Sequence, residues 1–306
     1  MSETKVPPAP RSTDAESVGG AERTQLQMIL SRFVRHRAAM VSLVVLVLIV
    51  LGAFLGPFLW RWDHLVHLEI PASVPPGPEH PLGTTTAGHD VLGQLMRGAQ
   101  QTLKVAFTVS IMGTVVGSLW GAASGYYGGR VDALMMRVVD VFMIVPLLVM
   151  VAAIAGNVRG GTTWYAVALI IGFFAWAQIA RVVRGVVLSL REQEFVEAAK
   201  AAGASPSWII VRHLLPNAAG PIIVAATLLI AVAILLEAGM SFLQFGIQPP
   251  DISLGQMIGD ARTAASTRPW LFYPPGVLLL VVCLTINFIG DGLRDALDPR
   301  QTMVRR

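Results

Sequence analysis

Six long apolar stretches alternate with polar segments along the chain, at approximately 38–59, 103–126, 134–155, 164–180, 218–240 and 274–290. A helix needs about 20 largely apolar residues to cross the hydrocarbon core of a bilayer. Each stretch is close to that length. The pattern therefore predicts an all-α integral membrane protein with six transmembrane helices and with both termini on the same side of the membrane.

The composition supports the membrane class and sets the orientation. Of the 306 residues, 54% are hydrophobic and only 14% are charged, whereas soluble domains carry roughly 25% charged residues. With the N-terminus in the cytoplasm, 17 of the 23 Lys and Arg residues lie in inner segments, and the others are Arg61, Arg97, Lys104, Arg159, Arg262 and Arg268. The positive-inside rule then places both termini in the cytoplasm. The net charge of +4 requires no nucleic-acid partner.

The two ends of the chain are predicted to be cytosolic tails. Residues 1–24 are rich in Pro, Ser, Thr and Gly and lack apolar periodicity, which is typical of disorder. Residues 25–37 carry apolar side chains at helical spacing opposite basic ones, which predicts an amphipathic helix at the inner interface. A cytosolic extension of the first span, 38–59, fits that pattern equally well. This span is too long for a cleavable signal peptide, so we expect an uncleaved anchor. The second tail is 296–306.

One polar, cationic segment, 194–217, lies between apolar stretches and reads as two short helices joined by a sharp turn. Alanines favour the first helix, and Gly203 can adopt the left-handed conformation that ends it. Ser205 is a suitable N-cap for the second helix, with Pro206 at its first position. Pro216 is expected to limit how far the second helix runs. Such a helix-turn-helix suits docking onto a soluble partner; the alternative is an ordinary amphipathic connector.

The same segment resembles the EAA loop of ABC-importer permeases. The resemblance rests on Glu197-Ala198-Ala199, then Gly203, then Leu215-Pro216 at this spacing. His213 departs from the general pattern, which prefers an apolar residue there, but the run from Arg212 to Asn217 looks like the peptide-importer branch of the family. In that family the second helix of the loop seats in a groove on a cytosolic ATPase and transmits its movement.

The resemblance implies roles for individual residues of the loop. Glu197 is expected to hold the loop through hydrogen bonds or an ion pair, and Ala198 and Ala199 are small enough for close helix packing. Gly203 makes the turn, and Leu215-Pro216 fixes the exit into the fifth span. The apolar residues that can contact the ATPase groove or this subunit's own helices are Trp208, Ile209 and Ile210.

Further motifs extend the resemblance from about residue 25 to residue 300. They are His80–Thr84 and Gly88–Leu92, Arg130–Asp132 with Pro146, Ser241–Pro250, and Gly290–Pro299. The outer match departs from the family pattern at Thr85, His89 and Gly93-Gln94. The resemblance implies the type I ABC-importer permease fold and the C-type subunit, which has the shorter outer loop. We expect an extracytoplasmic loop at 60–101 and a permease core at 102–295, with a cytosolic coupling loop at 181–217.

The resemblance also implies partners. The chain itself would bind no cofactor and no metal and would have no catalytic residues; ATP and Mg would be bound by two cytosolic ABC ATPase subunits or domains. A second, homologous permease would complete the pathway, and an extracytoplasmic solute-binding protein would deliver the substrate. The implied activity is import of dipeptides or oligopeptides across the cytoplasmic membrane of a prokaryote by alternating access. Nickel or another small solute is the alternative.

Polar and small residues within the spans are candidates for the pathway or for interfaces. The polar candidates are Gln178, Glu237 and Asn287. Gly113, Gly117 and Gly121 let helices approach closely, either within this chain or against a partner subunit. Arg137 and Asp140 lie three residues apart on one predicted helix and are expected to pair.

An enzymatic function has little support in the sequence. The chain has neither a G-x-x-x-x-G-K-[ST] phosphate loop nor a His-Glu-x-x-His zinc site. Ser241 and Asp291 lie in runs faintly similar to motifs of intramembrane proteases, but all six histidines fall outside the spans and Phe288 stands where the aspartyl motif requires glycine. Cys283 is the only cysteine, so no disulfide forms within the chain. An intramembrane protease stays a distant alternative.

Overall fold

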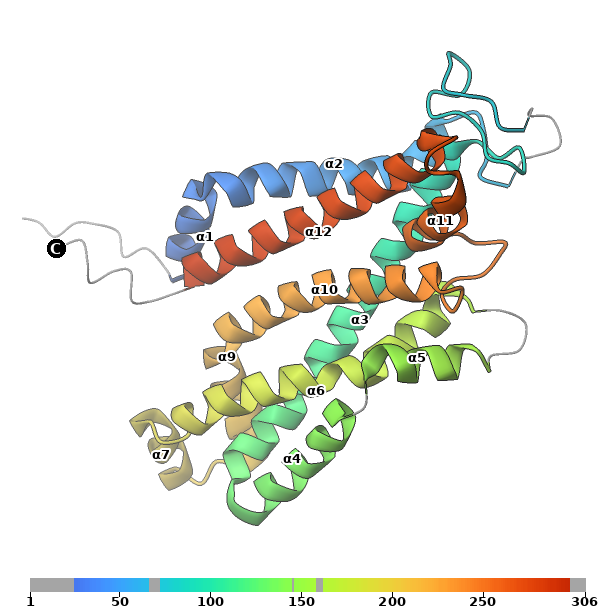
Figure 1. Ribbon diagram of the computed structural model, residues 1–306. Helices are drawn as coiled ribbons and strands as arrows, with labels where there is room; N and C mark the ends of the chain where they lie inside the picture. The colour runs from blue at the N-terminus through green and yellow to red at the C-terminus, as the bar shows by residue number, and fades with distance from the viewer. Residues whose placement is uncertain (1–24, 66–71, 145, 158–161, 298–306) are drawn as a thin grey trace, which may run out of the picture.

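The computed structural model describes residues 25–65, 72–144, 146–157 and 162–297, and Figure 1 shows its helices. Within these ranges the regular secondary structure is helical, apart from an isolated β-bridge between Thr84 and Asp90. The α-helices are α1 (Gln25–Arg35), α2 (Arg37–Leu59), α3 (Val91–Tyr127), α4 (Gly129–Ile144), α5 (Leu147–Ala155), α6 (Trp164–Leu190), α7 (Glu194–Ala201), α8 (Pro206–Ile209), α9 (Leu215–Asn217), α10 (Ala219–Phe242), α11 (Leu254–Ala261) and α12 (Pro269–Leu297). The predicted tail at 1–24, and the predicted tail at 296–306 beyond Leu297, lie outside the described residues.

The described helices provide five candidate membrane spans, and the predicted six if one bent pair of helices is counted as a single span. Five of them, α2, α3, α6, α10 and α12, are long and apolar enough to cross a bilayer, and α4 with α5 forms a sixth, bent candidate. In Figure 1, α2, α12, α10 and α6 run in roughly the same direction, and each contacts the next, whereas α3 crosses them obliquely. The prediction of an all-α membrane protein is confirmed.

The helix α3 begins at Val91, well before the predicted start of the second span near residue 103. Asp90 caps its first turn by accepting a hydrogen bond from the Gly93 N–H at 2.7 Å. With 37 residues, the helix is about 56 Å long at 1.5 Å per residue, which exceeds the roughly 30 Å of a hydrocarbon core. The predicted outer loop, 60–101, therefore ends in helix, and hydropathy missed these first turns because they are polar.

The glycines of α3 lie against α6 inside this chain. A Cβ atom on Gly117 would lie 2.6 Å from the Ile179 Cβ, and one on Gly121 would lie 2.3 Å from the Ala180 carbonyl oxygen. Neither distance is tolerated by real side chains, so the two backbones approach this closely only because the glycines lack a Cβ. Of the two alternatives for this stripe, packing within the chain is the one observed.

The third predicted span is bent. The axes of α4 and α5 differ by 73°, where a single helix over 134–155 was predicted. Pro146 is the N-cap residue of α5, and proline cannot supply the N–H that a continuous helix needs. On the α4 side of the bend, the Phe142 ring lies 5.5 Å from that of Phe173 and 5.2 Å from that of Trp176, both on α6.

The first helix is separate from the first span. His36 interrupts the helical backbone with an extended conformation, and its Nδ1 accepts the Ala39 N–H at 3.1 Å as the cap of α2. In Figure 1, α1 turns away from the axis of α2. The buried side chain of Phe33 packs with Ala39 and with Ala296 of α12. The amphipathic segment is thus an independent helix held against the end of α12, not an extension of α2.

A Cβ atom added at the α3–α6 contact tests the fold. Gly121→Ala should destabilise the protein by about 1–3 kcal/mol, because the added methyl group forces the two backbones apart. Gly52→Ala on α2, where nothing lies within 4 Å of the added atom, should leave stability unchanged or raise it slightly. Thermal unfolding of the purified protein in detergent measures both; equal melting temperatures would contradict the close contact.

Candidate functional site

The predicted turn in the polar segment is present and is a Schellman motif. Gly203 has φ of +79° and follows the end of α7. Its N–H bonds to the Lys200 carbonyl at 3.0 Å, and the Ala204 N–H bonds to the Ala199 carbonyl at 3.1 Å. These two bonds satisfy the last carbonyls of α7. Nothing lies within 4 Å of a Cβ built on Gly203, so the backbone conformation, and not crowding, requires glycine here.

The second helix of the segment starts as predicted but does not end as predicted. The Ser205 hydroxyl accepts the Trp208 N–H, and Pro206 occupies the first turn of α8. The chain then continues through a π-helical turn, Ile210–Leu214, in which the Leu215 N–H bonds to the Ile210 carbonyl, into α9 and almost directly into α10. This wider turn precedes Pro216, whose ring would collide with the carbonyl four residues earlier in a regular α-helix. Pro216 therefore modifies the helix instead of limiting it.

The second helix has one face inside the protein and one outside. Ile209 and Leu214 are fully buried, and Ile210 is nearly so, in the main apolar core. Trp208 and Val211 are 49% and 58% exposed. Of the three apolar residues predicted to contact either a partner or the chain itself, the two isoleucines contact the chain and Trp208 faces outward.

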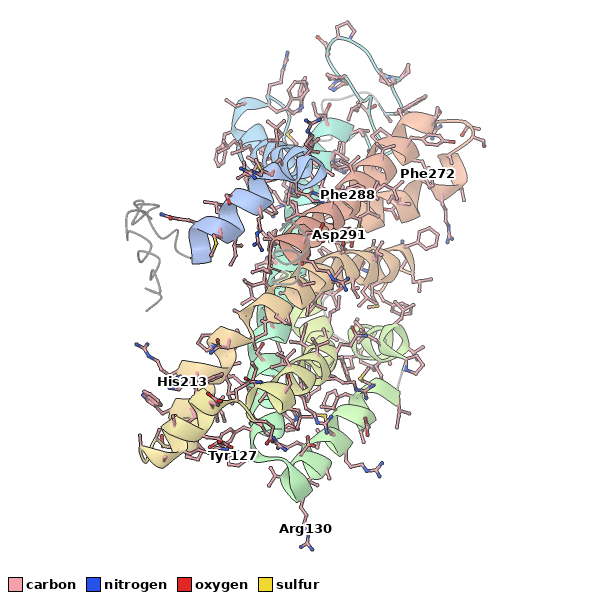
Figure 2. All side chains as sticks on the ribbon, turned by 90° about the vertical axis from the view of Figure 1, so that its left-hand side faces the viewer. Tyr127, Arg130, His213, Phe272, Phe288 and Asp291 are labelled. Atoms are coloured by element: carbon pink, nitrogen blue, oxygen red, sulfur yellow. The ribbon has the colours of Figure 1, made fainter. Side chains whose placement is uncertain are left out.

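His213, which departs from the general pattern, lies beside the exposed aromatic residues. Its ring centroid is 4.7 Å from that of Trp208 and 6.2 Å from that of Phe195 on α7. Figure 2 shows His213 at the end of the molecule that also carries Tyr127 and Arg130, far from Phe288. We call the exposed side chains Phe195, Trp208 and Val211, together with the half-buried His213, the loop patch.

The Glu-Ala-Ala run lies mainly on the outer surface of α7. Among the residues that the structure describes, the exposed Glu197 carboxylate has no hydrogen-bond or ion-pair partner, so the contact through which it is predicted to hold the loop is not formed within this part of the chain. Ala198 is exposed, whereas Ala199 is partly buried against the core. Within this chain the first helix is held instead by the fully buried Val196.

The ends of α3 and α6 anchor the loop. Arg191, at the end of α6, donates a hydrogen bond from Nη1 to the Gly125 carbonyl at 3.1 Å. The Lys200 ammonium of α7 lies 5.6 Å from the centroid of the Tyr126 ring. The predicted coupling loop was to start at 181, but α6 stays helical to Leu190. The polar loop is therefore attached by these contacts to the ends of two helices, α3 and α6, that pack against each other.

Ion pairs between helices strengthen this end. Arg184 of α6 binds the Asp132 carboxylate of α4 through two hydrogen bonds, from Nε to Oδ1 and from Nη2 to Oδ2, each of 2.5 Å. The Ser124 hydroxyl of α3 donates a hydrogen bond to the same carboxylate. Asp140 pairs with Arg181 of α6 at 2.8 Å, and not with Arg137 as predicted. Both partners lie far away in sequence, so spacing along one helix gave no signal for them.

The three polar candidates within the spans occupy different environments. Gln178 is exposed on α6. Glu237 is fully buried inside the chain, where it accepts hydrogen bonds from the Thr102 hydroxyl at 3.0 Å and the Ser241 hydroxyl at 2.6 Å. Asn287 is partly buried and donates to a carbonyl of its own helix. Of the three, Gln178 is thus the most exposed on the surface of the subunit, and Glu237 makes a packing contact.

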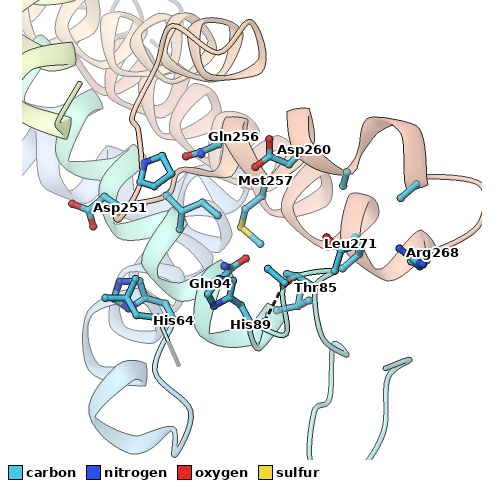
Figure 3. A pocket seen from close by; sticks show the side chains of 18 of the residues that line it. His64, Thr85, His89, Gln94, Asp251, Gln256, Met257, Asp260, Arg268 and Leu271 are labelled. Carbon is cyan, nitrogen blue, oxygen red and sulfur yellow. Dashed lines mark hydrogen bonds between the residues drawn. The ribbon is translucent and has the colours of Figure 1, made fainter. Parts of the chain in front are cut away.

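The opposite end of the chain, predicted to be extracytoplasmic, holds a pocket between α11 and the segment that leads into α3 (Figure 3). The sequence analysis did not identify this pocket, because its walls come from segments far apart in the chain. Composition gave little signal for it, because the first turns of α3 contribute only Val91 and Gln94 to its lining.

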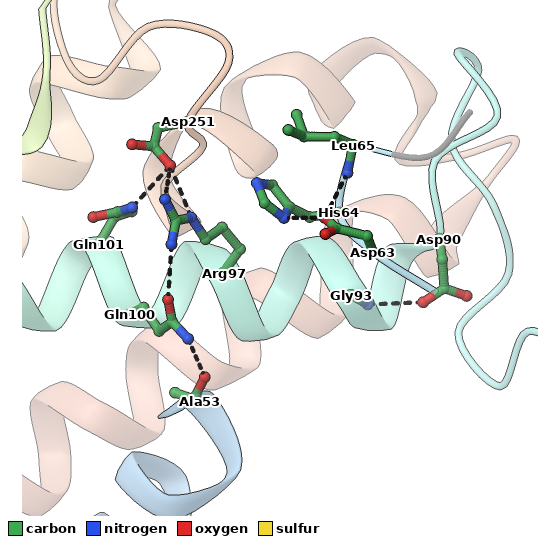
Figure 4. Close-up of polar contacts among 10 residues, drawn as sticks. All are labelled: Ala53, Asp63, His64, Leu65, Asp90, Gly93, Arg97, Gln100, Gln101 and Asp251. Carbon is green, nitrogen blue, oxygen red and sulfur yellow. Dashed lines mark hydrogen bonds and ion pairs between the residues drawn. The ribbon is translucent and has the colours of Figure 1, made fainter. Parts of the chain in front are cut away.

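A polar network beside this pocket joins α3 to its neighbours (Figure 4). Arg97 of α3 forms an ion pair of 2.5 Å with Asp251, which also accepts a hydrogen bond from the Gln101 amide at 2.8 Å. Gln100 accepts from Arg97 and donates to the Ala53 carbonyl of α2. These residues fix the outer end of α3 against α2 and against the segment before α11.

The two ion pairs of α4, Asp132–Arg184 and Asp140–Arg181, differ in burial and allow a matched comparison. Asp132→Asn should cost about 1.5–3 kcal/mol, the usual range for charge-assisted hydrogen bonds, because Asp132 is mostly buried and bonded to α3 and α6. Asp140→Asn should cost less than about 1 kcal/mol, since both side chains of that pair are about half exposed. Hydrogen–deuterium exchange of α4 measures the difference, and equal protection in both variants would refute it.

Known proteins resemble this chain over nearly its whole length. Residues 87–303 match the family described as binding-protein-dependent transport system inner membrane component. Residues 24–76 match the N-terminal TM domain of oligopeptide transport permease C.

Individual relatives are similar to a comparable extent. The oligopeptide transport system permease protein OppC of Mycobacterium tuberculosis is 40% identical over 280 residues, 91% of this chain and 96% of the relative. OppC of Bacillus subtilis is 36% identical over 298 residues, 96% of each chain. A chain of the MetNI methionine ABC transporter, solved in inward-facing conformations, has 23% identity and a TM-score of 0.56. The match covers 67% of this chain and 96% of that one, and it supports the fold alone.

Proposed function

Because this chain belongs to the family of binding-protein-dependent transport system inner membrane components, we propose that it is the permease subunit of an ABC importer for peptides. The similarity to oligopeptide permeases over more than nine-tenths of the chain carries the proposal. The partners proposed are a second, homologous permease, two cytosolic ABC ATPase subunits or domains that bind ATP and Mg, and a solute-binding protein outside the membrane.

The loop patch is the proposed contact with the ATPase. It combines an exposed tryptophan and valine on a helix whose other face is buried, so the helix presents apolar surface without exposing the core. A few residues carry most of the binding energy at protein interfaces, and tryptophan is enriched among them. The nearly continuous helical path from Pro206 to Phe242 then provides a rigid connection from the patch into the span α10. ATP-driven closure of the ATPases would move this path as a body and switch the access of the pathway.

Peptide transport is favoured over the alternatives by two observations. Both OppC relatives are named for oligopeptide transport, which supports a peptide substrate over nickel or another small solute. Ser241, the serine considered for an intramembrane protease, is buried. Its hydroxyl donates a hydrogen bond to the Glu237 carboxylate and accepts a hydrogen bond from the Ser253 hydroxyl. No His or Lys base contacts it within the described part of the chain.

A single aromatic side chain tests the docking contact. Trp208→Ala should weaken binding of the ATPase by about 2 kcal/mol, or about 30-fold in Kd, and should lower peptide uptake accordingly. Phe288→Ala on α12 is the control, because Phe288 is 45% exposed but lies far from the loop patch (Figure 2). Co-purification of the ATPase with each variant, at equal membrane expression, measures the effect. Equal recovery of the ATPase would exclude Trp208 from the interface.

The turn itself provides a test of coupling. Gly203→Pro should abolish uptake of a labelled panel of short peptides while leaving membrane insertion intact, since proline cannot adopt a positive φ. Gly129→Pro disturbs a second positive-φ position near the same loop, at the first residue of α4, and serves as the control for general damage. Uptake by the Gly203 variant at the level of the parent would refute the coupling role. Uptake of no peptide by the unmodified transporter would refute the peptide assignment.

A further inference from the structure

The pocket at the outer end of the chain has a volume of about 520 Å³ (Figure 3). Gln256 and Asp260 of α11 line one wall, and Thr85 and Gln94 line the wall formed by the start of α3 and the segment before it. Arg268 lies where the chain turns into α12. The volume is within the range of sites that hold small ligands, which is roughly 300–1,000 Å³.

The floor of this pocket is apolar. Val91 of α3, Met257 of α11 and Leu271 of α12 line it, and all three are buried in one apolar cluster at this end of the protein. An apolar floor with a few polar groups around it is the usual composition of a ligand pocket. Such a floor can accept an aliphatic side chain while the polar parts of the same ligand remain at the walls.

The wall formed by α11 offers hydrogen-bond acceptors with unused capacity. Gln256 is only 7% exposed, and its Oε1 has no hydrogen-bond partner among the described residues. Leaving a buried acceptor unpaired is unfavourable, because its lost hydration is not replaced by a hydrogen bond. Asp260 follows four residues later, on the same face of the helix. Its carboxylate accepts one hydrogen bond, from Gln244 at 3.3 Å, and has no cationic partner in the described part of the chain. Asp260 is exposed, but desolvation by the neighbouring protein raises its pKa above its ordinary value.

The other side of the pocket offers a cation. Arg268 is partly buried, lines the pocket and forms no ion pair with any residue that the structure describes. Asp251, a second carboxylate of the lining, is already bound by Arg97 at 2.5 Å. The pocket therefore contains one carboxylate and one guanidinium that are both uncompensated and do not pair with each other.

We propose that this pocket binds a short peptide with free termini. The peptide ammonium group would donate to the Asp260 carboxylate and to the Gln256 Oε1, and its carboxylate would accept from the Arg268 guanidinium. An aliphatic side chain would lie on the apolar floor. This inference rests on the proposed function and deepens it, since it gives the permease its own recognition of the substrate's two ends. A loop of the solute-binding protein has no free termini and would leave one of the two charges unpaired.

The assignment is tested by double-mutant cycles in which one change blocks one end of the peptide and the other change replaces the protein side chain proposed to bind that end. The probes are trileucine, N-acetyl-trileucine and trileucine amide, titrated calorimetrically into the full chain in lipid nanodiscs. N-acetylation should weaken binding about tenfold in the unmodified protein and leave binding unchanged in Asp260→Asn. Amidation should weaken it similarly in the unmodified protein and have no effect in Arg268→Gln. The controls are Glu79→Gln and Arg262→Gln, charged outer residues that are exposed and do not line the pocket.

The outcomes separate this inference from the proposed function. Two results would overturn the pocket assignment while peptide uptake by the assembled transporter persists. The first is that blocking a terminus weakens binding as much in the matching variant as in the unmodified protein. The second is that trileucine does not bind to the unmodified protein. Variants that weaken docking of the solute-binding protein, with unchanged affinity for trileucine, would also overturn it and assign the pocket to that protein. Failure of the unmodified transporter to take up any peptide would instead refute the proposed function. Melting temperatures of the two variants equal to that of the parent would exclude misfolding as the cause of weakened binding.

Discussion

Two helix backbones can approach as closely as those of α3 and α6 only where one of them carries no side chains. The glycine stripe of α3 provides that surface, and the distances from a built Cβ atom to α6 show that no larger residue fits without displacing backbone. The contact matters because both ends of the molecule are organised around it. Arg191 and Lys200 attach the polar loop to the C-terminal end of α3, and Arg97 attaches the segment before α11 to the N-terminal end of α3.

Local chemistry predicted the loop well. The left-handed glycine at 203, the cap at Ser205 and the first-turn Pro206 each depend on residues within a few positions of one another, and all three were observed. The number of spans and the helical class were likewise predictable, because a bilayer imposes a minimum apolar length. The start of α3 was not, since hydropathy does not distinguish a polar helix end from a polar loop.

The remaining errors have a common cause in contacts between distant segments. Asp140 had two arginines within reach, one on its own helix and one on α6, and only the fold brings Arg181 close enough to pair with it. The pocket at the outer end draws its walls from four segments between His64 and Leu271, so no stretch of sequence could indicate it. The bend between α4 and α5 had a visible signal in Pro146, but its size depends on how α5 packs against α6 and α10.

The π-helical turn at 210–214 gives a physical meaning to the spacing that identified the loop. A π turn holds one residue more than the α-helical turn it replaces. In a regular α-helix an extra residue would rotate everything that follows by about 100°, and the wider turn takes up that residue without the rotation. The buried Leu214 and the outward Trp208 can therefore lie on opposite faces of one helical path. The number of residues from Gly203 to Pro216 thus fixes how far the helical path turns about its axis. It sets the direction in which the loop patch faces relative to the span that begins at Ala219.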